Sequence, residues 1–135
     1  MNRNVRVILV LFTVVSSALT GCSRQPLDVH SIATLRKALP GRGWPEVSYH
    51  PVDAATLAQA GITAAGLIRS GDYRMEVYEV GRIDSVTRVA DLFAATGDVV
   101  FTGGMLVVLV PIGPDIAAVS ERLTNLGLLR HGTPR

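Results

Sequence analysis

Apolar positions recur along this chain with the period of a helix in some segments and the period of a strand in others. Three segments repeat apolar side chains every three or four residues, which is typical of helices with one buried face. The predicted buried positions are Ile32, Leu35 and Leu39 in the first segment, Val86, Val89, Ala90 and Phe93 in the second, and Ile116, Val119, Leu123 and Leu126 in the third. These stripes predict three amphipathic helices.

Residues that favour helix starts stand before each stripe. Asp28 and Asp84 are placed to cap the first two helices, because a carboxylate accepts hydrogen bonds from the orphan amides of a first turn. Pro114 fits the first position of the last helix, where its missing N–H costs nothing. Asp53 stands in the same way before residues 54–60, so we expect a further short helix there.

Strict alternation predicts two strands. Residues 46–50 place Val47 and Tyr49 on one side, and Pro51 is expected to end this strand at a sheet edge. Residues 73–78 alternate as well. In this second strand we expect an inward face of Tyr73, Met75 and Val77 and an outward face of Arg74, Glu76 and Tyr78.

Residues 99–110 predict a β-hairpin. Gly103-Gly104 separates two apolar runs, and glycine adopts the positive φ angles that a tight two-residue turn needs. The second run, residues 105–110, is apolar without alternation. A strand of this kind is expected to be central in its sheet and covered on both faces.

In chain order these elements predict α-β-α-β-α-β-β-α within a single α+β domain over residues 27–127. The expected sheet is small, mixed or antiparallel, and has about four strands packed with helices. Residues 62–70 fit either an extended segment or a short helical turn. Residues 128–135 are expected to form a flexible tail.

A segment of a different kind precedes this domain. Arg3 and Arg6 stand before an apolar run, and residues 7–20 number 14, whereas a spanning helix takes about 20 apolar residues. The run ends in Leu19-Thr20-Gly21-Cys22, which holds the only cysteine of the chain. Two plain interpretations of this segment are an uncleaved single-span anchor and a buried core helix with an incidental cysteine.

The four residues Leu19-Thr20-Gly21-Cys22 resemble the lipobox of bacterial lipoproteins at every position. The resemblance implies that residues 1–21 are a signal peptide, cut between Gly21 and Cys22, and that a diacylglycerol with palmitate-type chains is joined to the Cys22 sulfur. It implies a lipid anchor on the extracytoplasmic face of the cell membrane, with residues 22–26 as the lipidated tether. The predicted domain also resembles small uncharacterised actinobacterial lipoproteins, and this likeness of pattern implies no activity.

Charge argues against one class of partner. The 135-residue chain carries 13 Lys and Arg and 11 Asp and Glu, and without Arg3 and Arg6 the mature chain carries 11 of each sign. This balance gives no electrostatic support for nucleic-acid binding. Acylation of Cys22 would also remove the only thiol that could form a disulfide, attack a substrate or bind a metal.

Candidate catalytic and metal-binding residues are few. His30, His50 and His131 are not spaced as the three or four ligands of a zinc site. Neither Ser70 nor Ser120 lies in a nucleophile motif. We therefore expect no catalytic residues, no cofactor and no metal.

Three functions agree with these observations. The first is a non-catalytic accessory or binding domain of the cell envelope, held at the membrane by its lipid and acting on a protein partner. The second is a small-ligand carrier, which would need a pocket near Trp44, Tyr49 and Tyr78. The third is a small hydrolase, which would need a serine or an aspartate that converges with His50. Anchoring and the missing catalytic motifs favour the first.

Overall fold

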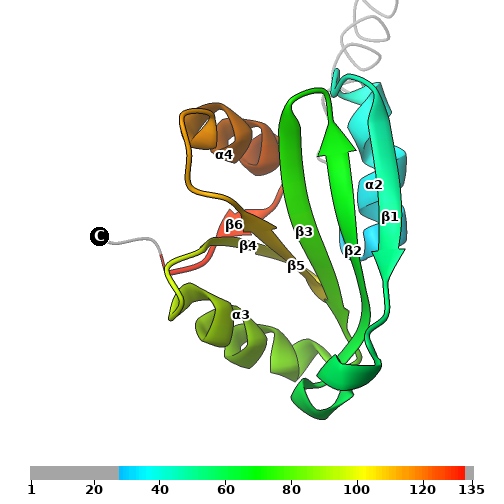
Figure 1. Ribbon diagram of the computed structural model, residues 1–135, viewed down its shortest axis with the longest axis vertical. Coiled ribbons are helices and arrows are strands. Elements are labelled where there is room, and N and C mark those ends of the chain that lie inside the picture. Colours follow the sequence, from blue (N-terminus) through cyan, green and yellow to red (C-terminus); the bar gives the residue numbers. More distant parts are fainter. Residues whose placement is uncertain (1–27, 133–135) are drawn as a thin grey trace, which may run out of the picture.

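The computed structural model describes residues 28–132 of the chain. They form a six-stranded antiparallel sheet in the order β1-β2-β3-β5-β4-β6, with helices on both faces (Figure 1). The strands are β1 (Val47–Val52), β2 (Ile62–Ser70), β3 (Tyr73–Val80), β4 (Val99–Gly103), β5 (Leu106–Val110) and β6 (Leu129–Arg130). The helices are α2 (Ile32–Gly41), α3 (Val86–Ala94) and α4 (Ile116–Asn125), with short 3₁₀ helices at Ala55–Ala60 (η1) and Ile83–Ser85 (η2).

The α+β class is confirmed, but the sheet has six strands rather than about four. One added strand is β2, the segment whose structure the sequence left open. It pairs with β1 on one side and with β3 on the other. Its centre reads Ala64-Ala65-Gly66, and these small residues weaken the apolar alternation that normally indicates a strand.

The other added strand lies at the C-terminal end of the domain. Leu128 is 1% exposed within the core, and β6 pairs with β4. Residues 128–130 therefore belong to the domain, and the prediction of a flexible tail from residue 128 is wrong for them. Burial of the Leu128 side chain favours this arrangement, because removing a leucine from water contributes roughly 1.5–3 kcal/mol.

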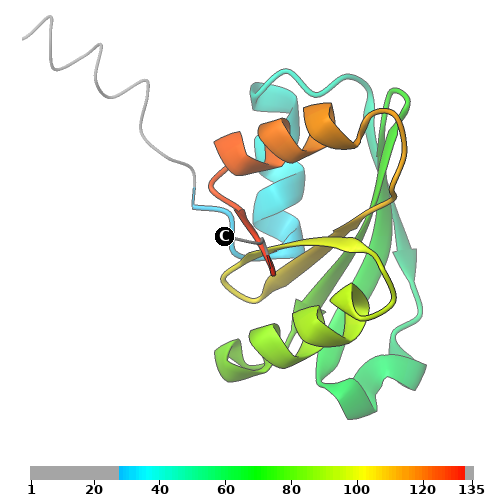
Figure 2. The same ribbon diagram turned by 90° about the vertical axis from the view of Figure 1, so that its left-hand side faces the viewer.

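The two faces of the sheet bury separate hydrophobic cores, and Figure 2 shows helices on both sides of it. α2 and α4 cover one face, over a core that includes Met75, Phe101 and Val108. α3 and η1 cover part of the other face, over a core that includes Val100 and Val107. The predicted apolar stripe of each α-helix packs into a core: those of α2 and α4 into the first, and that of α3 into the second.

β5 lies in the interior of the sheet, between β3 and β4. All five of its residues are buried. Val107 belongs to the core under α3, and Val108 belongs to the core under α2 and α4. The prediction of a central strand covered on both faces is confirmed.

The residue that caps the first helix lies three positions after the predicted cap, Asp28. Ser31 caps α2: its hydroxyl accepts a hydrogen bond from the Thr34 amide at 3.2 Å, and the Thr34 hydroxyl accepts one from the Ser31 amide at 2.9 Å. The Glu79 carboxylate on β3 accepts a further bond from the Ile32 amide at 2.9 Å. This last cap comes from a distant strand, which a local sequence pattern does not reveal.

The other predicted helix starts are displaced or changed in type. Asp84 lies in η2 and pairs with Arg82, so it does not cap α3. Pro114 stands two residues before α4 instead of at its first position. The short helix expected over residues 54–60 is the 3₁₀ helix η1, which buries none of its side chains fully. With so little packing to support it, this segment does not form a longer α-helix.

β1 continues through Pro51 to Val52, so Pro51 does not end it. The predicted edge position is confirmed, because β1 pairs with β2 alone. An edge strand tolerates proline, since no strand on its free side needs the missing N–H.

The β4–β5 hairpin turns at Gly104-Met105, one residue later than predicted. Gly103 pairs with Leu106 and so belongs to the ladder. Of the two glycines only Gly104 has a positive φ, 56°. The tight glycine turn is therefore confirmed, but its position is shifted.

Both glycines of this hairpin lie against the start of α2. A Cβ atom on Gly103 would approach the Val29 carbonyl oxygen to 2.8 Å, and one on Gly104 would approach the His30 Cβ to 2.4 Å. The Met105 amide donates a hydrogen bond to the His30 carbonyl oxygen at 3.1 Å. The turn is thus fixed against the first residues of the domain.

We predict that Gly104→Ala destabilises the domain by more than about 1–2 kcal/mol, the cost of a left-handed conformation for an L-residue. The added methyl group would also overlap the His30 backbone. Gly113→Ala is the control, since no atom lies within 4 Å of its Cβ position. Urea unfolding followed by circular dichroism measures both variants, and equal midpoints would contradict the predicted role of the turn.

We predict that Val107→Asp and Val108→Asp each prevent soluble folding. Each places an unpaired carboxylate where exposure is 0%, at a cost of several kcal/mol out of the roughly 5–15 kcal/mol that stabilises a domain. Ser48→Asp, on the exposed side of β1, should fold normally. Limited proteolysis compares the three, and a protease-resistant valine variant would show that its face of β5 tolerates water.

Candidate functional site

One half of the sheet has a face that no helix covers. α2 packs behind β1 and β3 on one side. On the other side the core under α3 reaches β2 and β3 at Ile62, Tyr78 and Val80, near one end of each strand. Strand register places nine side chains on this side, which we call the open sheet face: Ser48, His50 and Val52 from β1, Ala65, Leu67 and Arg69 from β2, and Arg74, Glu76 and Tyr78 from β3. Ala65 is buried and Tyr78 is half-buried, and the other seven are at least partly exposed.

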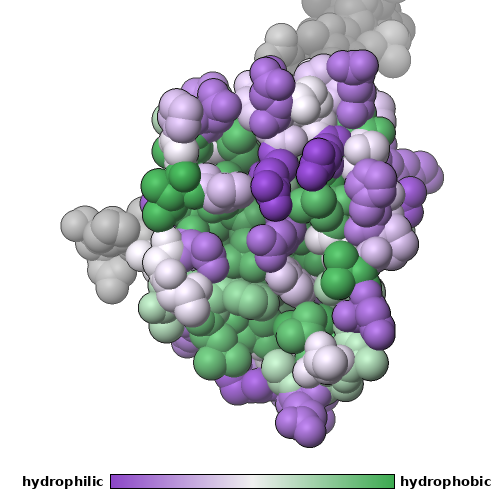
Figure 3. Space-filling model, in the orientation of Figure 1, coloured by the Kyte–Doolittle hydropathy of each residue, from purple (hydrophilic) through white to green (hydrophobic). Residues whose placement is uncertain are grey.

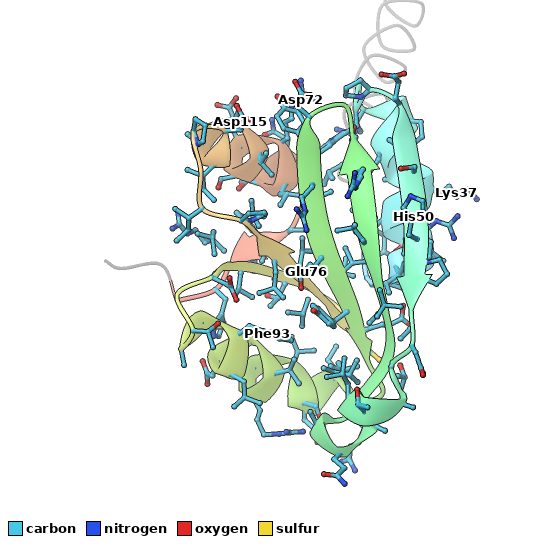
Figure 4. All side chains as sticks on the ribbon, viewed as in Figure 1. Lys37, His50, Asp72, Glu76, Phe93 and Asp115 are labelled. Carbon is cyan, nitrogen blue, oxygen red and sulfur yellow. The ribbon has the colours of Figure 1, made fainter. Side chains whose placement is uncertain are left out.

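The open sheet face changes from charged to apolar along the strands. Ser48, Arg69 and Arg74 form a row across the strands near the β2–β3 turn. The next row is His50, Leu67 and Glu76, and the side chains of His50 and Glu76 are labelled in Figure 4. The last row is Val52, Ala65 and Tyr78. Figure 3 shows the same gradient, hydrophilic toward the β2–β3 turn and hydrophobic toward α3 and η1.

Arg69 and Arg74 place two like charges directly opposite each other. They are cross-strand partners and both are exposed. Like charges in this position destabilise a sheet. Within residues 28–132 neither guanidinium takes part in a hydrogen bond or an ion pair. Two aspartates form ion pairs elsewhere: Asp84 pairs with Arg82, and Asp91 pairs with His131. Within the described residues the row therefore carries two positive charges that form no ion pair, and the acidic side chain of this face, Glu76, stands one row away.

Tyr78 joins the open sheet face to α3. The sequence predicted that it faces out, but the ring is half-buried and stacks on Phe93 with the centroids 4.7 Å apart. Its hydroxyl donates a hydrogen bond to the Glu76 carboxylate at 2.7 Å. Burial, that hydrogen bond and the charges of Glu76 and Asp98 raise the pKa of the Tyr78 phenol well above its usual value. The phenol therefore stays neutral and holds Glu76 in place.

The aromatic residues of the carrier hypothesis do not line one pocket. Trp44 is 4% exposed in the core under α2 and α4, with its ring at 5.8 Å from that of Tyr73. Tyr49 packs against the same core, under the Arg36 guanidinium at 4.3 Å. Tyr78 lies on the other face of the sheet.

The histidines lie apart. His50 is on the open sheet face, and His30 stands beside the β4–β5 turn. His131 contacts Asp91 of α3 through Nε2 at 2.6 Å. Across residues 28–132, no three side chains of His, Cys, Asp or Glu are grouped so that they could hold a metal ion.

The serines considered for catalysis do not meet His50. The Ser70 side chain is fully buried, and its hydroxyl donates to the Pro45 carbonyl oxygen. By register it lies on the side of the sheet opposite His50. Ser120 lies within α4, which also covers that opposite side.

A shallow hollow of about 590 Å³ lies between η1 and the loop after β3. Much of its wall is alanine and glycine. Arg82 lines this hollow, but its guanidinium already pairs with the Asp84 carboxylate at 2.9 Å, and both side chains are more than half exposed. This hollow offers few groups that would hold a small ligand in one orientation.

Sequence reasoning found only half of the open sheet face. Arg74 and Glu76 are exposed as predicted, but Leu67 and Arg69 were missed because β2 was not assigned. One signal was present. Gly71-Asp72 separates β2 from β3 as a two-residue hairpin turn, which would have indicated β2 and its register.

Leu19-Thr20-Gly21-Cys22, the four residues that resemble a lipobox, lie outside the described residues. Between residues 28 and 132, no helix has the length and apolar content that crossing a bilayer requires. Comparison with protein-family models, with curated proteins and with solved structures found no significant match to this chain.

Proposed function

We propose that the chain is a cell-envelope lipoprotein anchored through Cys22, and that its domain binds a protein partner on the open sheet face. The partner presents acidic groups to Arg69 and Arg74 and apolar groups to Leu67 and Val52. The domain acts as a non-catalytic accessory module on the extracytoplasmic side of the membrane.

The Arg69–Arg74 pair, which forms no ion pair within residues 28–132, is the observation that carries this proposal. A fold gains nothing from two opposed guanidiniums without a counter-charge. An acidic partner turns this unfavourable pair into a favourable one, because a carboxylate accepts charge-assisted hydrogen bonds from arginine. Leu67 in the next row and Val52 two rows away supply apolar area, and Val52 is 55% exposed.

The lipobox supports the location. Leu19-Thr20-Gly21-Cys22 lies only a few residues before Asp28, where the described domain begins. A diacylglycerol on Cys22 would hold the open sheet face near other envelope proteins. Confinement of this kind raises the effective concentration of a partner and lets a modest interface work.

We predict that Cys22→Ala leaves an unprocessed precursor without lipid. The wild-type protein from the membrane fraction should begin at residue 22 and carry the added mass of acyl chains. Intact mass spectrometry measures the mass of both proteins. A wild-type chain that retains Met1 and carries no lipid mass would contradict the proposed anchor.

We predict that Arg69→Glu combined with Arg74→Glu weakens partner binding at least tenfold, or about 1.4 kcal/mol. A photo-crosslinking residue at position 50, in the centre of the open sheet face, reports binding in native membranes. Capture should fall with the double variant and with rising salt, because screening weakens exposed charge pairs.

Lys37→Glu is the matched control for this charge reversal. Lys37 lies on α2, behind the sheet, and is exposed (Figure 4). Capture through position 50 should be unchanged in this variant. Equal capture by the double arginine variant and the wild type would refute an acidic partner on this face.

A further inference from the structure

Apolar side chains are exposed at the end of the domain where the described chain begins. Met105, in the β4–β5 turn, is 40% exposed, Ile83 of η2 is 66% exposed and Leu129 of β6 is 72% exposed. Figure 2 shows the start of the described chain, the β4–β5 turn and the first turn of α3 on the same side of the molecule.

Hydrogen bonds connect the elements that carry these side chains. The Met105 amide donates to the His30 carbonyl oxygen, and the Met105 carbonyl oxygen accepts from the Val80 amide at 2.9 Å. Val80 is three residues before Ile83. Leu129 pairs with Thr102, next to the residue where the β4 ladder ends. We call Ile83, Met105 and Leu129 the apolar end.

The tether limits how far this end can lie from the lipid. Cys22 and Asp28 are six residues apart, so even a fully extended chain spans only about 20 Å between them. A domain of about 100 residues has a radius of gyration near 13 Å, and so it is wider than the tether is long. The end that carries Asp28 must therefore lie closest to the anchored cysteine.

We propose that the apolar end rests on the bilayer surface and orients the domain. Ile83, Met105 and Leu129 insert into the boundary between headgroups and acyl chains. The inference rests on the proposed lipid anchor. Because a diacylglycerol already supplies two chains, these contacts set orientation and add little to the strength of attachment.

The occupant is the lipid surface itself. The charges next to the apolar end have both signs, since Asp28 and Asp84 are acidic, and Arg82, which pairs with Asp84, and Arg130 are basic. Apolar insertion therefore carries the contact, and binding should not require anionic lipid. The three side chains come from η2, the β4–β5 turn and β6, so three separate segments of the chain contribute to the contact.

The test uses full-length lipidated protein reconstituted into phosphatidylcholine vesicles. Acylation blocks Cys22, so Met105→Cys, Leu129→Cys and Ser48→Cys each offer one thiol for a fluorophore. Brominated acyl chains quench probes that reach the apolar boundary. We expect quenching at positions 105 and 129 to exceed that at position 48 by about threefold or more, as for a side chain buried 5–10 Å into the interface.

A second set of variants separates contact from folding. Ile83→Ser combined with Leu129→Ser should lower the quenching at position 105 while the near-UV circular dichroism stays that of the wild type. Ile112→Ser is the matched control. Ile112 is 73% exposed, but it comes after the last residue of β5, whereas Met105 comes just before the first. This change should leave the quenching as it was.

The outcomes distinguish this inference from the proposed function. Protein without lipid mass on Cys22 overturns both. Lipidated, vesicle-bound protein with equal quenching at positions 48, 105 and 129 overturns only the oriented contact. Stronger quenching at position 48 than at 105 overturns it as well, and places the open sheet face on the membrane.

Discussion

Burial of β5 on both faces is the constraint on which the rest of this structure depends. Its five residues are all apolar, so the chain must supply cover above and below them. α2 and α4 provide one layer and α3 with η1 provides the other. α3 lies over β4 and β5, whereas α2 lies behind β1 and β3. β1–β3 keep helical cover on one side only, and the open sheet face is the result.

The parts of the fold that the sequence predicted are those with strong periodicity. The stripe of α3 and the apolar run of β5 are long enough to be recognised, and both lie where expected. β2 and β6 were missed for different reasons. Small residues at Gly66 and its neighbours hide the alternation of β2, and a two-residue strand has no period at all. The Glu79 cap on α2 arises from tertiary structure alone.

The candidate site also has a part that can be recognised in the sequence and a part that arises only in the fold. A lipobox is a linear motif, so its residues can be recognised without any fold. The open sheet face is made by register, which brings Arg69 opposite Arg74 only after β2 has been placed. Tyr78 shows the limit of alternation, because its side of β3 was identified correctly, but Phe93 of α3 then covers it. The local sequence pattern indicates which residues share a face of a strand, and tertiary packing decides whether that face is exposed to solvent.

The edges of the sheet would matter for many copies held on one membrane by the proposed lipid anchor. Such copies would diffuse in two dimensions, where free strand edges meet often and invite edge-to-edge pairing. β6 offers only two residues, too few for a stable ladder with another chain. β1 is longer, but Pro51 interrupts its row of donors. The domain can therefore be crowded on a surface without growing into a continuous intermolecular sheet.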